Sequence, residues 1–284
     1  MIAAPVKSKK IGTVSKKRNK MTIAIGMLCH DGIIIAADTQ LVWTDGTTRT
    51  GTKVWQLATN SAQYVIANAS NDGLAVDTLI QDIFDKLERE DPIDLRAIEK
   101  TIRKTMHEWT RAYSRQDIPS IALVIGVKLT GIQEGEKLAL YHCGPPNTMI
   151  RITPEDGGYI AVGGGSLITD PIFRTLFSCD CSAHTAIHQM SYLMYRAKKD
   201  AASICGGETS AIFLSTKLAS PISIPPINME IAESQGESLD FVLRTAVLAC
   251  FTDNPQSAEV LADVTKTAII SRARSLATSQ FPIQ

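Results

Sequence analysis

Three residue types that can support acyl transfer stand near the start of the sequence: Thr22, Asp38 and Lys53. A threonine hydroxyl becomes a nucleophile when a base takes its proton, and a threonine at a chain N-terminus carries such a base in its own α-amine. The reference pKa of an α-amine is about 7.7–8.0, and a nearby ammonium lowers it by like-charge repulsion. We expect Lys53 to supply that ammonium and Asp38 to hold it by an ion pair. The arrangement requires removal of Met21.

The segment 22–39, TIAIGMLCHDGIIIAADT, predicts the element that sets Thr22 beside Asp38. It has the pattern of two short apolar strands joined at Asp31-Gly32, a dipeptide typical of tight hairpin turns. The threonine and the acid stand near opposite ends of this hairpin, so its two arms would bring them close. The lysine begins a further strand-like segment, KVWQL, at 53–57.

The rest of the chain predicts two groups of strands, each followed by two helices. The expected strands are 53–57, 63–67, 121–127, 137–142, 149–153, 159–162 and 209–215. The expected helices are one from Asp72 through Leu87, then 95–113, 166–178 and 183–200, with a polar loop at 44–52. This order predicts stacked sheets with helices on their outer faces. A proline-rich connector at 221–226 predicts a boundary, and 239–251 and 257–273 have helical patterns beyond it.

Composition predicts a soluble globular protein of one large domain, alone or with an appendage. The chain has 284 residues, 44% hydrophobic and 20% charged, with a net charge of zero. The zero balance and the lack of interleaved basic and aromatic residues give no sign of a nucleic-acid partner. No apolar run is long enough to cross a bilayer, and none follows the basic residues 1–20 as a signal peptide requires. Six cysteines without a regular framework favour free thiols in the cytoplasm.

A second interpretation concerns the segment from Cys179 to His188, CDCSAHTAIH, whose cysteines and histidines are residue types that bind zinc. The two histidines, His184 and His188, are four residues apart and would share one helix face. The first pair is Cys-x-Cys, however, and Ser182 is typical of a helix N-cap. We expect a helix start here. The glycines at 163–165 lack the lysine and spacing of a phosphate loop and predict a tight turn.

The pattern TIAIG…DGIIIAADT followed by KVWQL resembles the start of proteasome β-type subunits, members of the N-terminal nucleophile (Ntn) hydrolases. The segment Ile66-Ala67…Asp72 is similar to that family's glycine-rich turn, and AVGGG at 161–165 to its second turn. RAKKDAAS at 196–203, followed by Gly206-Gly207, is similar to its closing motif. These matches run in the family's order over about 22–215.

The resemblance implies an α+β fold, a four-layer αββα sandwich, over residues 22–215. Residues 1–21 would be a basic pro-segment or follow an unused upstream start, and 216–284 would be a linker and a helical C-terminal extension. Thr22 falls on the family's nucleophile, Lys53 on its catalytic lysine and Asp38 on the acid that pairs with that lysine. The implied reaction forms an acyl-enzyme that water releases, without metal or organic cofactor.

The resemblance also assigns supporting residues. Asp200 and Ser203 fall on an acid and a serine near the nucleophile, although a helix-end or turn role fits them as well. Asn68 falls in the oxyanion turn, where the family has glycine. The donor there is a backbone N–H, which asparagine retains.

Two further departures concern activation. Gly164 replaces a serine of the hydroxyl network, and Met21 stands where self-cleaving members have glycine. A Met-Thr start suits ordinary removal of the initiator methionine, the way in which some bacterial relatives expose their threonine.

We therefore expect a threonine-type peptidase that acts on peptides or unfolded proteins. We expect a homo-oligomeric ring with inward-facing sites and consider an ATPase unfoldase as a partner. Two alternatives remain open: a catalytically inactive structural subunit of the same fold, and an Ntn amidohydrolase of small amides. The extension is expected to dock on its own domain or on a neighbouring subunit.

Overall fold

The structure, a computed structural model, describes residues 22–42, 47–113, 118–131, 137–144, 148–251 and 255–278. The predicted pro-segment or unused start, 1–21, which includes Met21, lies outside the described residues.

Two five-stranded antiparallel sheets and one small hairpin form the β-structure of the described chain. The first sheet has the order β10 (Tyr159–Gly163), β1 (Ile23–Cys29), β2 (Gly32–Asp38), β11 (Thr209–Ser215) and β12 (Ile222–Ile224). The second has the order β5 (Val54–Ala58), β6 (Ala62–Ser70), β7 (Ile121–Leu129), β8 (Leu138–Gly144) and β9 (Thr148–Ile152). The hairpin pairs β3 (Gln40–Val42) with β4 (Thr48–Thr50).

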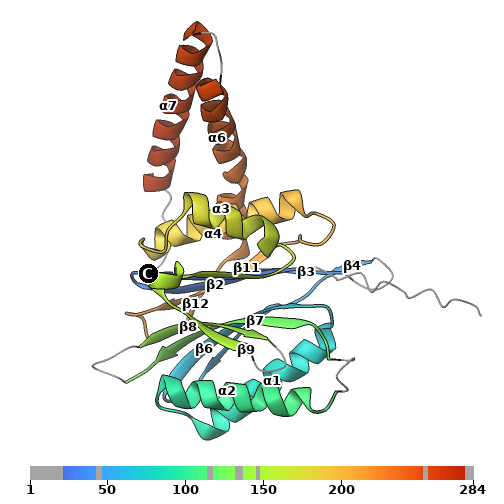
Figure 1. Cartoon of the computed structure of the whole chain (residues 1–284). Coiled ribbons are helices and arrows are strands. Elements are labelled where there is room, and N and C mark those ends of the chain that lie inside the picture. The colour runs from blue at the N-terminus through green and yellow to red at the C-terminus, as the bar shows by residue number, and fades with distance from the viewer. Residues whose placement is uncertain are drawn as a thin grey trace, which may run out of the picture.

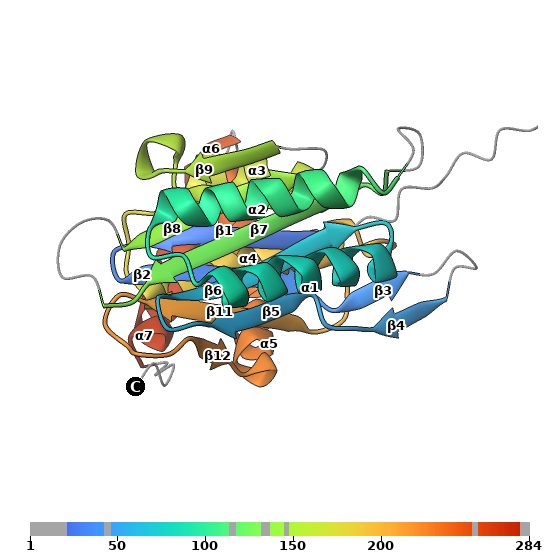
Figure 2. The same cartoon turned by 90° about the horizontal axis from the view of Figure 1, so that it is seen from below.

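Helices lie on the outer faces of the two large sheets (Figures 1 and 2). The second sheet carries α1 (Gly73–Glu90) and α2 (Leu95–Thr110), and the first carries α3 (Ser166–Leu176) and α4 (Ala183–Asp200). A short 3-10 helix, Pro154–Asp156, precedes β10, and the C-terminal part contains α5 (Pro226–Ser234), α6 (Gly236–Phe251) and α7 (Pro255–Thr278). Side chains of Asp72, Asp94 and Ser182 cap the N-termini of α1, α2 and α4.

The sheets face each other across a layer of small and branched apolar side chains. From the first sheet, Ile33 and Ile35 of β2 point into this layer, whereas Ile34 and Ala36 point toward α4. A strand buried on both faces reads as a continuous apolar run, which explains the sequence GIIIAA. The layer between the sheets also contains Ala24, Ala37, Val54, Val65, Ala67, Ala69, Val124, Leu140, Val162, Ile212 and Leu214.

The prediction of an α+β fold is confirmed to this extent: the described chain combines helices with antiparallel sheets. One detail of the first hairpin is corrected. The two-residue turn is His30-Asp31, and Gly32 already pairs with Cys29 in the ladder. Gly32 is required as a strand residue, because a Cβ there would lie 2.2 Å from the Leu214 carbonyl oxygen.

Two other segments differ from the prediction. The polar stretch 44–52, expected to be a loop, contributes β4. The proline-rich connector at 221–226 contains β12 and the first residue of α5, where Pro226 occupies a position that has no intrahelical N–H partner to lose.

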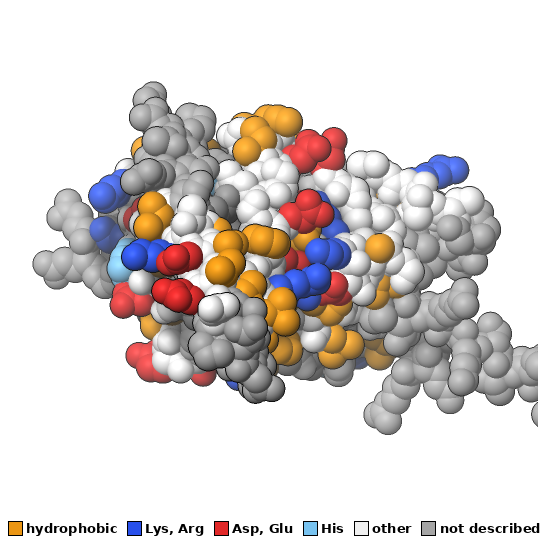
Figure 3. All heavy atoms as spheres, turned by 90° about the horizontal axis from the view of Figure 1, so that it is seen from above, with side chains coloured by type: hydrophobic (Ala, Val, Ile, Leu, Met, Phe, Trp, Pro, Cys, Tyr) orange, Lys and Arg blue, Asp and Glu red, His pale blue; other side chains and the backbone are white. Residues whose placement is uncertain are grey.

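Helices α6 and α7 form a hairpin that projects beyond α3 and α4 (Figure 1). Several large apolar side chains on α5–α7 are more than half exposed, and Figure 3 looks down on this end of the molecule. They are Ile227, Ile231, Phe241, Val247, Leu248 and Val260. Among the described helices, none combines the length and apolarity needed to span a bilayer.

The contacts of Gly32 predict the effect of adding a single methyl group. In Gly32→Ala the new Cβ would also approach the Phe213 ring to 2.4 Å, so we expect the free energy of unfolding to fall by about 1–3 kcal/mol. Gly73→Ala is the matched control, because a Cβ at Gly73 meets nothing within 4 Å. Urea unfolding of both variants measures the difference, and equal losses would contradict the packing described here.

Candidate active site

The first hairpin and the start of β5 bring Thr22, Asp38 and Lys53 to one place. Thr22 directly precedes β1, and Asp38 ends β2. The Ala24–Ala37 register sets Asp38 opposite Ile23, whose N–H donates to Asp38 Oδ1 at 3.2 Å. Lys53 lies immediately before β5, a strand of the other large sheet.

The three side chains are joined by hydrogen bonds in a nearly dry setting. Thr22 Oγ1 donates to Asp38 Oδ1, and Lys53 Nζ donates to both Thr22 Oγ1 and Asp38 Oδ1, the latter at 2.8 Å. Lys53 Nζ also donates to the Gln40 carbonyl. Thr22, Asp38 and Lys53 are 5%, 0% and 3% exposed. The constellation predicted from the sequence is therefore assembled.

Burial shapes the acid–base behaviour of Lys53. Removal from water lowers the pKa of its amine below the usual 10.5, and the Asp38 carboxylate opposes this effect. Because desolvation disfavours the ammonium, the neutral amine is more accessible than on an exposed lysine. A neutral Nζ in contact with Thr22 Oγ1 can accept the hydroxyl proton.

The second oxygen of Asp38 is held by a glycine turn whose role the sequence did not indicate. Gly206 N–H donates to Asp38 Oδ2 at 3.1 Å, and the Gly206 carbonyl accepts from Gln40 N–H at 3.2 Å. A Cβ on Gly206 would lie 2.0 Å from the Gln40 side-chain oxygen. Gly207 has a φ of +71°, which favours glycine. The only signal was the Gly-Gly pair.

Cys205, just before this turn, is a buried thiol near the ion pair. Burial raises the pKa of its thiol to about 12, and the Asp38 charge adds to the shift. The thiol therefore stays protonated at neutral pH and packs as an apolar group.

The predicted tight turn at 163–165 packs against the backbone of Thr22. Gly163 has a φ of +89°, and a Cβ there would lie 2.0 Å from the Thr22 carbonyl oxygen. Gly165 N–H donates to that same oxygen at 3.4 Å. Between them, Gly164 offers no hydroxyl to the site.

Asn68 departs from the role expected of it. Its backbone N–H donates to the Lys53 carbonyl at 3.1 Å, so this N–H, expected as the oxyanion donor, already has a partner. The Val54–Ala67 register sets Asn68 opposite Lys53, and such pairs point their side chains to the same face. Asn68 is 3% exposed, and its Nδ2 has no hydrogen-bond partner. The free donor at this position is the side-chain amide.

Asp200 and Ser203 are not joined to the three residues by hydrogen bonds in the described structure. Asp200 ends α4 and accepts from Arg196 at 2.6 and 2.9 Å. Ser203 is exposed in the turn that follows. Their supporting roles stay predictions.

The segment from Cys179 to His188 forms the start of α4. Ser182 caps the helix by accepting from Thr185 N–H, as expected, and the His184 and His188 rings stand 4.9 Å apart. No group of three or more His, Cys, Asp or Glu side chains in the described ranges is arranged to hold a metal ion.

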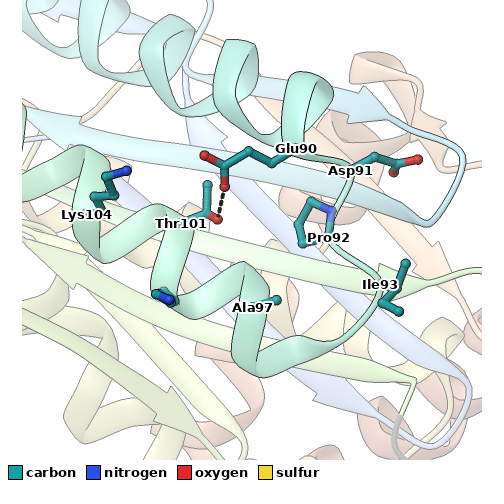
Figure 4. Close-up of a pocket in the computed structure, with 8 residues that line it drawn as sticks. Glu90, Asp91, Pro92, Ile93, Ala97, Thr101 and Lys104 are labelled. Carbon is teal, nitrogen blue, oxygen red and sulfur yellow. Dashed lines mark hydrogen bonds between the residues drawn. The ribbon is translucent and has the colours of Figure 1, made fainter.

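A separate hollow of about 480 Å³ lies at the bend between α1 and α2 (Figure 4). It is lined by Glu90, Asp91, Pro92, Ile93, Ala97, Lys100, Thr101 and Lys104. Thr101 Oγ1 donates to Glu90 across it at 2.6 Å. None of its residues belongs to the Thr22 site. The hollow adjoins the C-terminal end of α1, whereas Asn68 lies ahead of the N-terminal end of that helix.

Comparison with known proteins yields no family model and no curated protein that matches this chain. Solved structures do match. An Anbu (Gly-1) mutant from Hyphomicrobium sp. strain MC1 gives a TM-score of 0.67 at 15% identity, covering 82% of this chain and 98% of that one. Anbu (ancestral beta-subunit) from Yersinia bercovieri gives 0.64 at 18% identity, covering 78% and 97%. The Anbu complex from Pseudomonas aeruginosa, solved as a helical assembly, gives 0.61 at 17% identity, covering 78% and 96%.

These likenesses show a proteasome-like fold and correct the sequence-based recognition. The assignment to proteasome β-type subunits, which the sequence motifs resemble, is wrong, because the matching structures are Anbu proteins, a distinct group. The error has a simple source. Most of the motifs that carried the resemblance supply residues that surround Thr22, namely Asp38, Lys53, Gly163 and Gly206, and such residues do not distinguish Anbu proteins from proteasome β-type subunits.

The buried position of Lys53 predicts a measurable titration. Its folded-state pKa lies below the ordinary 10.5, so between the two values the native state binds fewer protons than the unfolded state and stability rises with pH. NMR of lysine labelled with ¹³C at Cε, with the signal identified by its loss in Lys53→Met, measures the midpoint. A midpoint at or above 10.5 would contradict the lowered pKa and would mean that the attraction of Asp38 outweighs the effect of burial.

Proposed function

We propose that the chain is an Ntn hydrolase with the αββα sandwich of that class, and that it cleaves peptide bonds with Thr22 as nucleophile. The single observation that carries the proposal is the hydrogen bonding of Thr22 Oγ1 to both Asp38 and Lys53 in a buried site. Buried ionisable groups that converge on a hydroxyl are typical of an activated nucleophile.

In the proposed reaction, the neutral Lys53 amine takes the proton of Thr22 Oγ1, which attacks the substrate carbonyl. Asp38 then stabilises the ammonium that forms, because its carboxylate is already paired with Nζ. As the intermediate collapses, the Lys53 ammonium gives its proton to the leaving nitrogen, the C–N bond breaks, an ester forms on Thr22 and the amine product is released. Water then attacks the ester, its proton passes through the Lys53 amine to Thr22 Oγ1, and the carboxylic acid product is released. The α-amine of Thr22 is a second base for this step in a chain that begins at Thr22.

For the oxyanion we propose the Asn68 side chain as a donor. Its Nδ2 is buried and has no hydrogen-bond partner, and Asn68 stands across the strand pair from Lys53. A side-chain amide is an effective oxyanion donor when it is fixed in advance of the reaction.

We further propose self-association, with peptides or unfolded proteins as substrates and an ATPase unfoldase as an additional partner. Exposed apolar side chains on α5–α7 support an interface between copies, since contiguous exposed apolar surface marks interaction sites. The Pseudomonas aeruginosa Anbu complex forms a helical assembly. The same proposal divides the chain into 1–21, 22–215 and 216–284. It also includes a cytoplasmic location, which is favoured by the free cysteines among the described residues.

A second candidate is an inactive structural subunit of the same fold. It is favoured by the exposed Ser203, by the pairing of Asp200 with Arg196, and by the missing hydroxyl at Gly164. Activity measurements separate it from the first.

Substitution of the nucleophile tests the proposed reaction. Thr22→Ala is expected to abolish hydrolysis of fluorogenic peptides by protein whose N-terminus, measured by intact mass, is residue 22. Thr175→Ala is the control, because its exposed hydroxyl on α3 bonds only within the helix. Equal activity of the two variants would overturn the mechanism, and an inactive wild type with that N-terminus would favour the structural subunit.

Substitution of Asn68 tests the oxyanion donor. Loss of one such donor lowers kcat by about 10²–10³-fold, so Asn68→Ala is expected to reduce kcat by that factor with little change in KM. Asn60→Ala is the control. Asn60 is exposed, lies just before β6 at the end opposite Asn68, and donates a hydrogen bond to Asp91. Matching kcat values for both variants would remove Asn68 from the reaction.

A further inference from the structure

The segment 201–208 connects α4 to β11 and carries a donor of the Thr22 site. Gly206 N–H in this segment donates to Asp38 Oδ2 at 3.1 Å. The segment touches the hairpin again where Thr39 N–H donates to the Glu208 carbonyl at 2.9 Å. The orientation of Asp38 therefore depends on how this connection is held.

One side chain of the C-terminal extension holds both ends of the connection. Glu233, on α5, accepts from Lys198 Nζ at 2.8 and 3.1 Å, and Lys198 lies in the last turn of α4. The same carboxylate accepts from Thr209 Oγ1, at the first residue of β11. Glu233 thus links the last turn of α4, which precedes the connection, to the first residue of β11, which follows it.

These contacts are shielded from solvent and adjoin the site. The side chains of Lys198 and Glu233 are 16% and 13% exposed, so salt and water screen them only in part. Thr209 is 2% exposed and stands directly opposite Asp38 in the β2–β11 register. Lys198 also acts electrostatically on Cys205, next to Gly206.

We propose that Glu233 is a positioning residue for the Thr22 site, and that the C-terminal extension thereby takes part in building it. Glu233 fixes the connection 201–208 so that Gly206 N–H is held on Asp38 Oδ2. Its effect on turnover rests on the proposed hydrolase function, whereas its effect on Gly206 does not.

A second carboxylate of the extension provides a matched control. Asp240, on α6, accepts from Tyr192 at 2.7 Å, Arg196 at 3.2 Å and Lys199 at 3.0 Å, all on α4. Its described bonds reach no residue of 201–209. Loss of Asp240 therefore weakens the contact of the extension with α4 but leaves the Glu233 bridge in place.

The test is hydrogen exchange of the Gly206 amide in the full chain, measured by mass spectrometry with fragmentation to single residues. Glu233→Ala is expected to speed this exchange about tenfold, the factor that loss of one ordinary hydrogen bond represents. Thr209→Val, which keeps the side-chain shape and removes only the hydroxyl donor, should have the same effect. Thr209→Ser keeps the hydroxyl donor, so the Gly206 amide should exchange as slowly as in the wild type. Asp240→Ala should also leave the Gly206 exchange rate unchanged.

Faster exchange in Glu233→Ala and Thr209→Val alone supports the proposal, and in an active enzyme we expect kcat to fall with KM unchanged. Unchanged exchange in both variants overturns it, and so does an equal effect of Asp240→Ala. A wild-type protein without peptidase activity would remove the proposed function, while the exchange rates would still decide the role of Glu233.

Discussion

The ion pair of Asp38 and Lys53 joins the two large sheets at a point that water does not reach. Asp38 ends a strand of one sheet, and Lys53 precedes a strand of the other, with exposures of 0% and 3%. Burial of two charges costs several kcal/mol per ion unless hydrogen bonds complete their shells. Asp38 meets this requirement with donors from Thr22 Oγ1, Ile23 N–H, Lys53 Nζ and Gly206 N–H. The pair is stable only when the segments that carry these donors are all in place.

The distance between the sheets is therefore part of the site. Gly26 and Gly126 lie where the sheets approach each other. A Cβ on Gly26 would stand 2.6 Å from Val124 of the other sheet, and a Cβ on Gly126 would stand 2.8 Å from Ile35. Larger residues would push the sheets apart and separate the ammonium from the hydroxyl. Close packing and the assembly of the site thus depend on one geometric condition, because Thr22 and Lys53 come from segments that belong to different sheets.

Local pattern was enough to predict most strands and helices and the meeting of Thr22 with Asp38, since a hairpin joins residues that are near in sequence. It missed the short strands β3, β4 and β12 and the helix α5. Lys53 was named for its charge, and no local pattern predicts its contact with Thr22, because that contact depends on how two sheets pack. The Gly206 donor lies 168 positions from Asp38, and no local signal marks such a contact. The use of Asn68 N–H was equally hidden, since it is fixed by the register of β5 on β6. The His30-Asp31 turn was missed because Gly32 is needed for packing against β11.

The expectation of a proteasome-like fold and the wrong family assignment rest on the same residues. A hydroxyl, an acid, an amine and glycines where a Cβ would collide are what the Thr22 site demands of any chain that builds it, so they identify the site and the fold around it. The resemblance ended at Ser215, and helices α5–α7 follow that point. Their carboxylates Glu233 and Asp240 form ion pairs with Lys198, Arg196 and Lys199 near the end of α4. The C-terminal helices, which the resemblance does not cover, are therefore tied to the element that leads into the site.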